Sequence, residues 1–470
     1  MATASLPGNP AFTAPDPSGL APVPSHTLVV SIAGLSPRAY RSTSWTSAWM
    51  PNLAGLAADG AAADAVASVS PASPGPAHAS LASGRTPSAH GLGADHPLGA
   101  QGVDAAFHRE AAAIQAPTLW TAAAEAGVSM ALLGWPTTAG AEVEWLFPEL
   151  IPARLGEASP KLLEGQATPE LLDVARQLGA DRPEAGFQGP ARDAVLAGLA
   201  CHVLTKPDPP RLTLLRFSQT EVPLWRAGPD SEATREAFAR VDAALGQVLG
   251  CLAGVGRLEA TALLVTGDVP VEPVHTLIQP NVALERAGLL VPGPGSRTGI
   301  RRWEALARSN GTSAFVYARD PEVAVLARAA LREAAEQTLA YRVVSAEEML
   351  ALGADREAWF GLEAEPGFVF GDGLRGAALV LPSAARGAWG RLSHKATPDV
   401  GFVAWGAGIR VGVRIPVLRQ TDVAPTVARL VGLVLDGSDG RPLVGMLRPP
   451  PPSVAAPRAG GRRPADSGAR

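Results

Sequence analysis

The chain has 470 residues, of which 47% are hydrophobic and 18% are charged, and its net charge is −4. A chain of this length can bury a large core, and its weak negative charge excludes the basic face that nucleic-acid binding requires. No run of about 18 apolar residues predicts a membrane span.

Both ends of the chain differ in composition from the middle. Residues 1–25 and 449–470 are rich in Pro, Ala, Gly and Ser and show no pattern that could form a core. We therefore predict two disordered tails around one domain, residues 26–448. The N-terminal tail has neither the basic start nor the apolar stretch of a secretory signal peptide, so the sequence predicts a cytoplasmic protein.

Between the tails, short apolar runs bounded by turn residues are typical of buried strands. They are residues 26–32, 129–133, 211–217, 261–266 and 401–405.

Helical segments lie between these runs. Residues 52–59 follow a proline and stop at a glycine, residues 231–253 carry an apolar stripe at helical spacing, and a third helix with a proline in its first turn starts near residue 421. Together they predict an α/β fold with a mostly parallel central sheet and helices on both faces. Ligands of such sheets bind beyond the carboxyl ends of the strands, and residues 147–200 are the candidate for a cap over that place.

Several segments at these strand ends carry a family resemblance. They are Val29–Gly34, Met50–Gly60, Pro76–Gly91, Gly134–Pro136, Gly228–Asp230, Leu264–Asp268, Ser393–His394, Asp422–Thr426 and Asp439–Leu443. In this order they resemble the type I phosphodiesterases and nucleotide pyrophosphatases of the alkaline phosphatase superfamily, over about residues 26 to 448. The resemblance implies an alkaline-phosphatase-like three-layer sandwich and a site for two zinc-like ions at the strand ends.

The resemblance also shows which family residues this chain lacks. It places Ala33 and Val269 at metal-binding positions, Pro74 at the nucleophilic threonine, Ala77 at the asparagine that contacts phosphate, and Trp225 at a metal-binding histidine.

Three residual ligands remain, namely Asp268 and His394, which are identical to family ligands, and Glu221, which replaces an aspartate. A catalytic zinc usually keeps three protein ligands, and neither metal position reaches that number by direct alignment. The resemblance therefore implies that no cofactor is bound, and that the protein is a pseudo-hydrolase retained for binding or regulation.

Two alternatives stay open. The first is an active phosphoester hydrolase with a rearranged site for zinc or another divalent metal. It would use Ser73 or a water, or less directly Ser70, as nucleophile, and it would recruit ligands from His275, Glu272, Asp95 or His96. The second is a metal-free sensor of a small molecule or nucleotide, with a pocket lined by Trp135, Trp225 and His394. The partner would be a phosphorylated small molecule or a protein.

The same residues also have purely structural interpretations. Asp268 would cap a turn, His394 would be solvated, Glu221 would be a surface carboxylate, and Trp225 would fill the volume left by an absent metal. His78 would pack under the strand-to-helix turn and His90 would hold a turn. The sequence does not determine whether Cys201 and Cys251 are paired, and their structural interpretation is two small buried apolar side chains.

Overall fold

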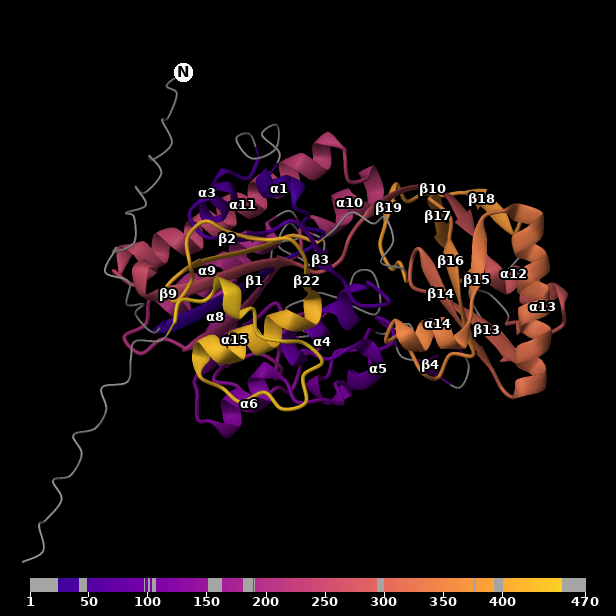
Figure 1. The fold of residues 1–470 in the computed structure, drawn as a ribbon, viewed down its shortest axis with the longest axis horizontal. Coiled ribbons are helices and arrows are strands. Elements are labelled where there is room, and N and C mark those ends of the chain that lie inside the picture. The colour runs from indigo at the N-terminus through magenta and orange to yellow at the C-terminus, as the bar shows by residue number, and fades with distance from the viewer. Residues whose placement is uncertain are drawn as a thin grey trace, which may run out of the picture.

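The structure, a computed structural model, describes residues 24–41, 49–96, 98–99, 102–103, 107–150, 163–180, 189, 191–293, 300–374, 378–392 and 400–449. Its centre is an eight-stranded sheet of mixed direction (Figure 1). In spatial order the strands are β21 (Val413–Ile415), β2 (Ala61–Ala63), β20 (Phe402–Gly406), β9 (Thr261–Gly267), β1 (His26–Ile32), β8 (Leu212–Phe217), β6 (Met130–Leu133) and β7 (Trp145–Phe147).

The middle of the sheet is parallel, as predicted. Strand β1 lies between β8 and β9 and runs parallel to both, and β6 runs parallel to β7 and β8. Strand β20 is antiparallel to β9 and β2. All seven residues of β1 are buried, because helices cover both faces of the sheet.

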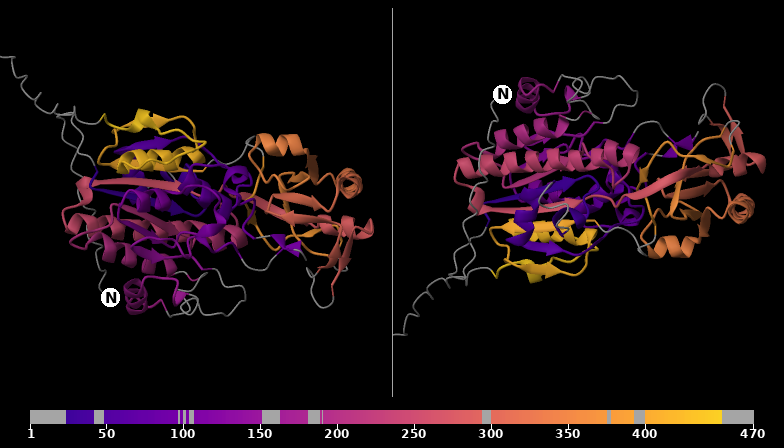
Figure 2. Two further views of the ribbon diagram at one scale, coloured as in Figure 1. Left: turned by 90° about the horizontal axis from the view of Figure 1, so that it is seen from below. Right: turned by 90° about the horizontal axis from the view of Figure 1, so that it is seen from above.

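Alternate residues of β1 enter two different cores. Leu28, Val30 and Ile32 pack in the core that contains α3 (Pro51–Ala58), α9 (Arg192–Leu204) and α11 (Glu232–Gly254). Val29 packs on the opposite face, in the core that contains α4 (Pro74–Ser83), α6 (Leu119–Glu125) and α15 (Val423–Val431). Figure 2 shows the two helical layers above and below the sheet. This arrangement confirms the predicted fold class.

A second lobe, which the sequence did not reveal, is built from the segment between β9 and β20. It contains the antiparallel sheet of β13 (Ala305–Ser309), β14 (Ser313–Ala318), β16 (Phe360–Ala364) and β15 (Tyr341–Val344), with α12 (Pro280–Arg286), α13 (Pro321–Thr338) and α14 (Ala346–Ala351). Strand β10 (Glu272–Ile278) leads from the large sheet into this lobe and pairs with β17 (Gly367–Phe370), β18 (Val380–Pro382) and β19 (Gly387–Ala388). The lobe has its own core and stands beside the large sheet (Figure 1).

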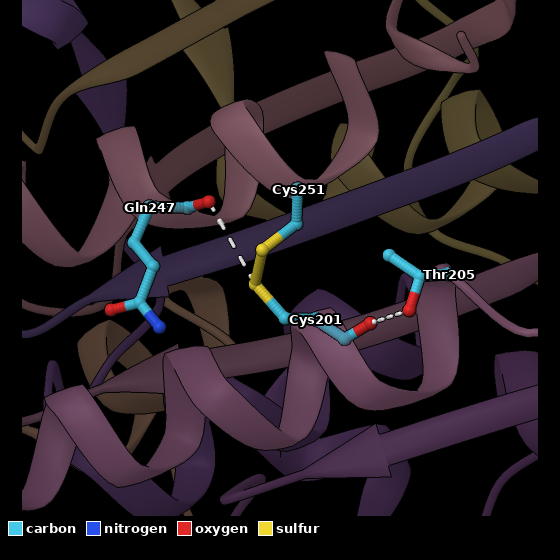
Figure 3. The surroundings of a disulfide bond; sticks show 4 residues. All are labelled: Cys201, Thr205, Gln247 and Cys251. Carbon is cyan, nitrogen blue, oxygen red and sulfur yellow. Dashed lines mark hydrogen bonds between the residues drawn. A yellow bond between two sulfur atoms is a disulfide. The ribbon is translucent and has the colours of Figure 1, made fainter. Parts of the chain in front are cut away.

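The two cysteines form a disulfide bond, so their interpretation as separate buried thiols is wrong. Cys201 on α9 is bonded to Cys251 on α11, and their Cα atoms are 5.6 Å apart (Figure 3). The two helices pack side by side, which brings together cysteines that are separated by 50 residues in the sequence. Because α9 belongs to this helical layer, the last part of the segment 147–200 covers the face of the sheet. Of that segment, residues 151–162, 181–188 and 190 lie outside the described part of the chain.

Among the described residues, no helix is both long and apolar enough to cross a membrane.

Candidate functional site

The strand ends that the sequence singled out meet at the boundary between the sheet and the second lobe (Figure 1). Ala33 follows β1, Asp268 follows β9, and Glu221 begins α10 (Glu221–Ala227), which follows β8. Helix α4 begins at the same end with Pro74, and Glu149 follows β7. Three carboxylates from three connections therefore approach one another.

A buried guanidinium group holds these carboxylates together. Arg216, the penultimate residue of β8, is 1% exposed and bonds both carboxylate oxygens of Glu149 at 2.6 Å. Its Nη2 atom donates to Glu221 and lies 3.5 Å from Oδ2 of Asp268. Arg192 on α9 adds a second guanidinium at 3.0 Å from Glu149. We call these five residues the Arg216 network.

The network keeps Arg216 charged. Burial alone would lower the pKa of its guanidinium, but attraction to Glu149, Glu221 and Asp268 raises that pKa above its ordinary value. Burial raises the pKa of Glu221 to about 7, against the opposing charge of Arg216. Burial likewise raises the pKa of Asp268, with Arg216 and two backbone N–H groups opposing. Arg216 therefore provides the positive charge that makes burial of three carboxylates tolerable.

The residues present do not fit the metal ions that the family resemblance implies. Asp268 accepts hydrogen bonds at Oδ1 from the backbone N–H groups of Gly34 and Val269, at 2.8 and 2.6 Å, and faces Arg216 with Oδ2. Glu221 and Glu149 are both bonded to Arg216. Within the described residues, no three His, Cys, Asp or Glu side chains are grouped so as to hold a metal. The cation at this place is a side chain of the protein.

A side chain of the protein also binds the N-terminus of α4. The positive end of a helix dipole and its unpaired N–H groups form a natural anion site. In α4, however, Pro74 and Pro76 have no N–H group, and the N–H of Gly75 donates to Oδ1 of Asp95 at 2.7 Å. A Cβ atom at position 75 would lie only 3.0 Å from that oxygen, so glycine permits the approach. The carboxylate of Asp95 thus accepts the N–H group that a bound anion would need at this helix end.

A cavity of about 190 Å³ opens beside the Arg216 network and the start of α4. Its wall carries three aromatic rings, which belong to Phe107, Trp225 on α10 and Trp389 after β19. The exposed surface of its lining is mostly apolar. Cavities of this kind, with a few polar groups and both lobes contributing, are typical places for small-molecule binding.

Two histidines near α4 have structural roles, as predicted. His78 is fully buried and bonds Ser31 through Nε2 at 2.9 Å and the carbonyl of Pro74 through Nδ1 at 2.7 Å. Nδ1 of His90 accepts the N–H of Leu92, and its Nε2 lies 3.0 Å from Oγ of Ser80. Burial lowers the pKa of both rings, that of His90 to about 4.

The buried ring of His90 should make folding sensitive to acid. The unfolded chain binds a proton on this ring below about pH 6.5, whereas the folded chain binds it only near pH 4. Stability therefore falls as the pH drops through that window, by up to about 1.4 kcal/mol per pH unit. In His90→Asn the side-chain oxygen can accept the Leu92 N–H without titrating, so this slope should flatten in urea unfolding measured from pH 7 to pH 4.5. The exposed His275 serves as control, and an equal change in His275→Asn would refute the assignment.

Four other residues that the sequence proposed for the site do not line the cavity, namely Ser70, Ser73, Glu272 and His275. Ser73 is completely buried, its hydroxyl has no hydrogen-bond partner among the residues that the structure describes, and it is not among the residues that line the cavity. Ser70 donates to the carbonyl of Leu392. Glu272 bonds Arg391, and His275 bonds Thr276. His394 lies outside the described residues.

Two structural interpretations need correction. Glu221 is not a surface carboxylate, because its side chain is 21% exposed and bonded to buried Arg216. Trp225 does not fill a buried volume, because it is 42% exposed and lines the cavity. The other tryptophan expected there, Trp135, is buried against His78 and is not part of the cavity wall.

The chain resembles known proteins in both sequence and fold. The sequence model of the family described as type I phosphodiesterase/nucleotide pyrophosphatase matches residues 27–378. The chain belongs to this family. Solved structures share its fold: mouse ectonucleotide pyrophosphatase/phosphodiesterase 5 has a TM-score of 0.63 at 17% identity, and the human protein of that name has 0.62 at 16%. Each comparison covers 88% of this chain and 97% of the other. An inactive form of the mouse protein in complex with AMP is similar at a TM-score of 0.63 and 16% identity, with the same coverage. No curated protein matches the chain.

Within the family fold, the substituted positions are apolar and packed. Ala33 is 1% exposed, Ala77 is completely buried, and Val269 is 3% exposed and part of a hydrophobic core. Sequence reasoning missed Arg216, although one signal was present. It is the only charged residue in a strand whose six residues are all buried, and a buried arginine needs acidic partners.

Proposed function

We propose that this protein is a catalytically degenerate member of the type I phosphodiesterase/nucleotide pyrophosphatase family that uses the cavity at its strand ends as a metal-free binding site. The Arg216 network is the observation that carries this proposal. A guanidinium group takes the place between carboxylates where a hydrolase of this kind needs a divalent cation to activate its nucleophile and stabilise its leaving group. Pro74 supplies no hydroxyl in place of the nucleophile.

The start of α4 supports the same proposal independently. Phosphoester chemistry needs donors that receive the phosphate oxygens. The first turn of α4 offers one N–H group, at Gly75, and Asp95 accepts it. AMP, which is bound in the mouse relative's structure, would therefore meet a carboxylate at this helix end. This observation favours a ligand other than a nucleotide over the nucleotide-sensor alternative.

The test combines metal analysis with activity. The purified chain is equilibrated with zinc or manganese, separated from free metal, and analysed by mass spectrometry. The same sample is assayed with bis(p-nitrophenyl) phosphate and a dinucleotide. We expect substoichiometric metal and no turnover above that of an Asp268→Asn variant. Two ions per chain, with turnover that this variant loses, would contradict the proposal and restore the rearranged metal site.

A further inference from the structure

We propose that the cavity beside the Arg216 network binds a small organic cation that carries an aromatic ring, and that it rejects phosphate esters of similar size. This inference deepens the proposed function and rests on it, because a pair of divalent ions would reverse the charge of the cavity floor. Three features of the cavity carry it: Arg216 and the N-terminus of α4 are already engaged by carboxylates, the carboxylate of Glu221 lines the cavity, and the walls are aromatic.

Two groups that would hold an anion, the guanidinium of Arg216 and the N-terminus of α4, are engaged by the chain itself. Arg216, which lines the cavity, is bonded to Glu149 and Glu221 and faces Asp268. The first turn of α4, which also lines the cavity, donates its N–H to Asp95. A phosphate entering here would have to displace a carboxylate from each partner and leave it buried without a counterion, which is costly.

The charged groups of the lining favour a cation. Three carboxylates line the cavity, those of Asp95, Glu149 and Glu221, against two guanidinium groups, those of Arg109 and Arg216. His108 also lines it, and burial lowers the pKa of this ring to about 4, so it is neutral at pH 7. Because the pKa of Glu221 is about 7, this carboxylate is mostly ionised at pH 7.5 and presents a negative charge to the cavity. Glu221 is the most exposed carboxylate of the Arg216 network, with a side chain 21% exposed against 2% for Glu149.

The aromatic walls and the volume of the cavity indicate the chemical type and the size of the ligand. The rings of Phe107, Trp225 and Trp389 present π-faces and edges that attract an organic cation and stack on an aromatic ring. A dry cavity of about 150 Å³ holds one benzene molecule. The volume of about 190 Å³ therefore fits one ring with a short ammonium arm.

Calorimetric titration with three matched probes tests the proposal. Benzyltrimethylammonium carries a positive charge, benzyl alcohol is neutral, and phenyl phosphate is an anion of similar size. We expect the cation to bind the purified chain at pH 7.5 roughly tenfold more tightly than the alcohol, which is the scale of a desolvated cation–π contact with a nearby carboxylate. Phenyl phosphate and AMP should show no saturable heat.

Substitutions of two cavity residues test whether the probes bind in this cavity. Glu221→Gln keeps the shape of the side chain and removes its charge, so it should weaken cation binding at least fivefold while leaving benzyl alcohol unchanged. Trp225→Ala should weaken binding of both aromatic probes. The matched controls lie in the second lobe: Glu363→Gln, a carboxylate bonded to Arg342, and Trp359→Ala, another partly exposed tryptophan. Neither should change binding.

Three results would contradict the inference. It is overturned if phenyl phosphate binds as tightly as the cation, if none of the probes binds, or if the two control variants lose binding as Glu221→Gln does. Because Trp225 lies largely at the surface, its variant should fold even where a substitution in the network does not. Metal content and turnover, measured on the same sample, distinguish the two proposals: bound metal with turnover refutes the proposed function, whereas anion binding without metal refutes this inference alone.

Discussion

Replacing Arg216 with methionine is expected to lower the free energy of unfolding by about 3–5 kcal/mol, because Glu221 and Asp268 would remain buried without their counterion and Glu149 would keep only Arg192. Methionine preserves much of the volume, so the loss would report charge rather than a cavity. Urea unfolding at pH 7.5, followed by tryptophan fluorescence, measures it. The exposed Arg414, which pairs with Asp64, is the matched control. Arg414→Met should lower the free energy of unfolding by less than about 1 kcal/mol.

Two further measurements sharpen this result. Adding Glu221→Gln to the methionine variant should recover part of the lost stability, since a carboxylate left without its guanidinium partner is then removed. Millimolar manganese should raise the melting temperature of Arg216→Met, in which three carboxylates face a vacated cation position, and should leave the wild type unchanged. A methionine variant as stable as the wild type would show that the network does not hold its carboxylates ionised.

Removing the disulfide bond is expected to have an effect of similar size. The bond closes a loop of 50 residues, and the chain-entropy estimate for such a loop is about 4 kcal/mol. The double variant Cys201→Ala, Cys251→Ala should therefore unfold at a lower urea concentration than the wild type. Dithiothreitol should shift the wild type to the same midpoint and have no effect on the variant.

Thiol counting provides the independent check. The unfolded wild type should react with a maleimide only after reduction, and two modified cysteines without reductant would contradict the bond. Disulfide bonds persist in oxidising compartments and are rare in the cytosol. The cytoplasmic localisation that the N-terminal residues predict stays a prediction, which cell fractionation tests.

Most of the large sheet could be predicted from the sequence, because its central strands are buried on both faces. The runs at 26–32 and 211–217 are rich in Leu, Val and other apolar residues and correspond to β1 and β8. The second lobe was missed for the opposite reason. Its strands are short and antiparallel, and several carry charged residues, as Tyr341–Val344 does, so their pattern resembles that of loops between helices.

The site was harder to predict than the fold. The resemblance identified the positions that lost their metal-binding side chains, but it could not show what replaced the metal charge. Arg216 lies on the strand itself, not after it, and its partners come from three separate connections. Asp95 is 20 residues beyond the N–H group it accepts. Such pairings depend on tertiary distance, which neither periodicity nor motif spacing encodes.

The buried guanidinium also limits how this protein can evolve. Mutating Arg216 first would leave Glu221 and Asp268 buried without their counterion and would make the protein less stable. Restoring an aspartate at Ala33 first would add a fourth buried negative charge beside the same cluster. Each single step back toward a metal site therefore passes through a less stable protein, whatever its eventual benefit. Under the proposed function, in which an arginine supplies the positive charge of a metal ion, descendants of this chain are expected to diversify their ligands sooner than to regain hydrolysis.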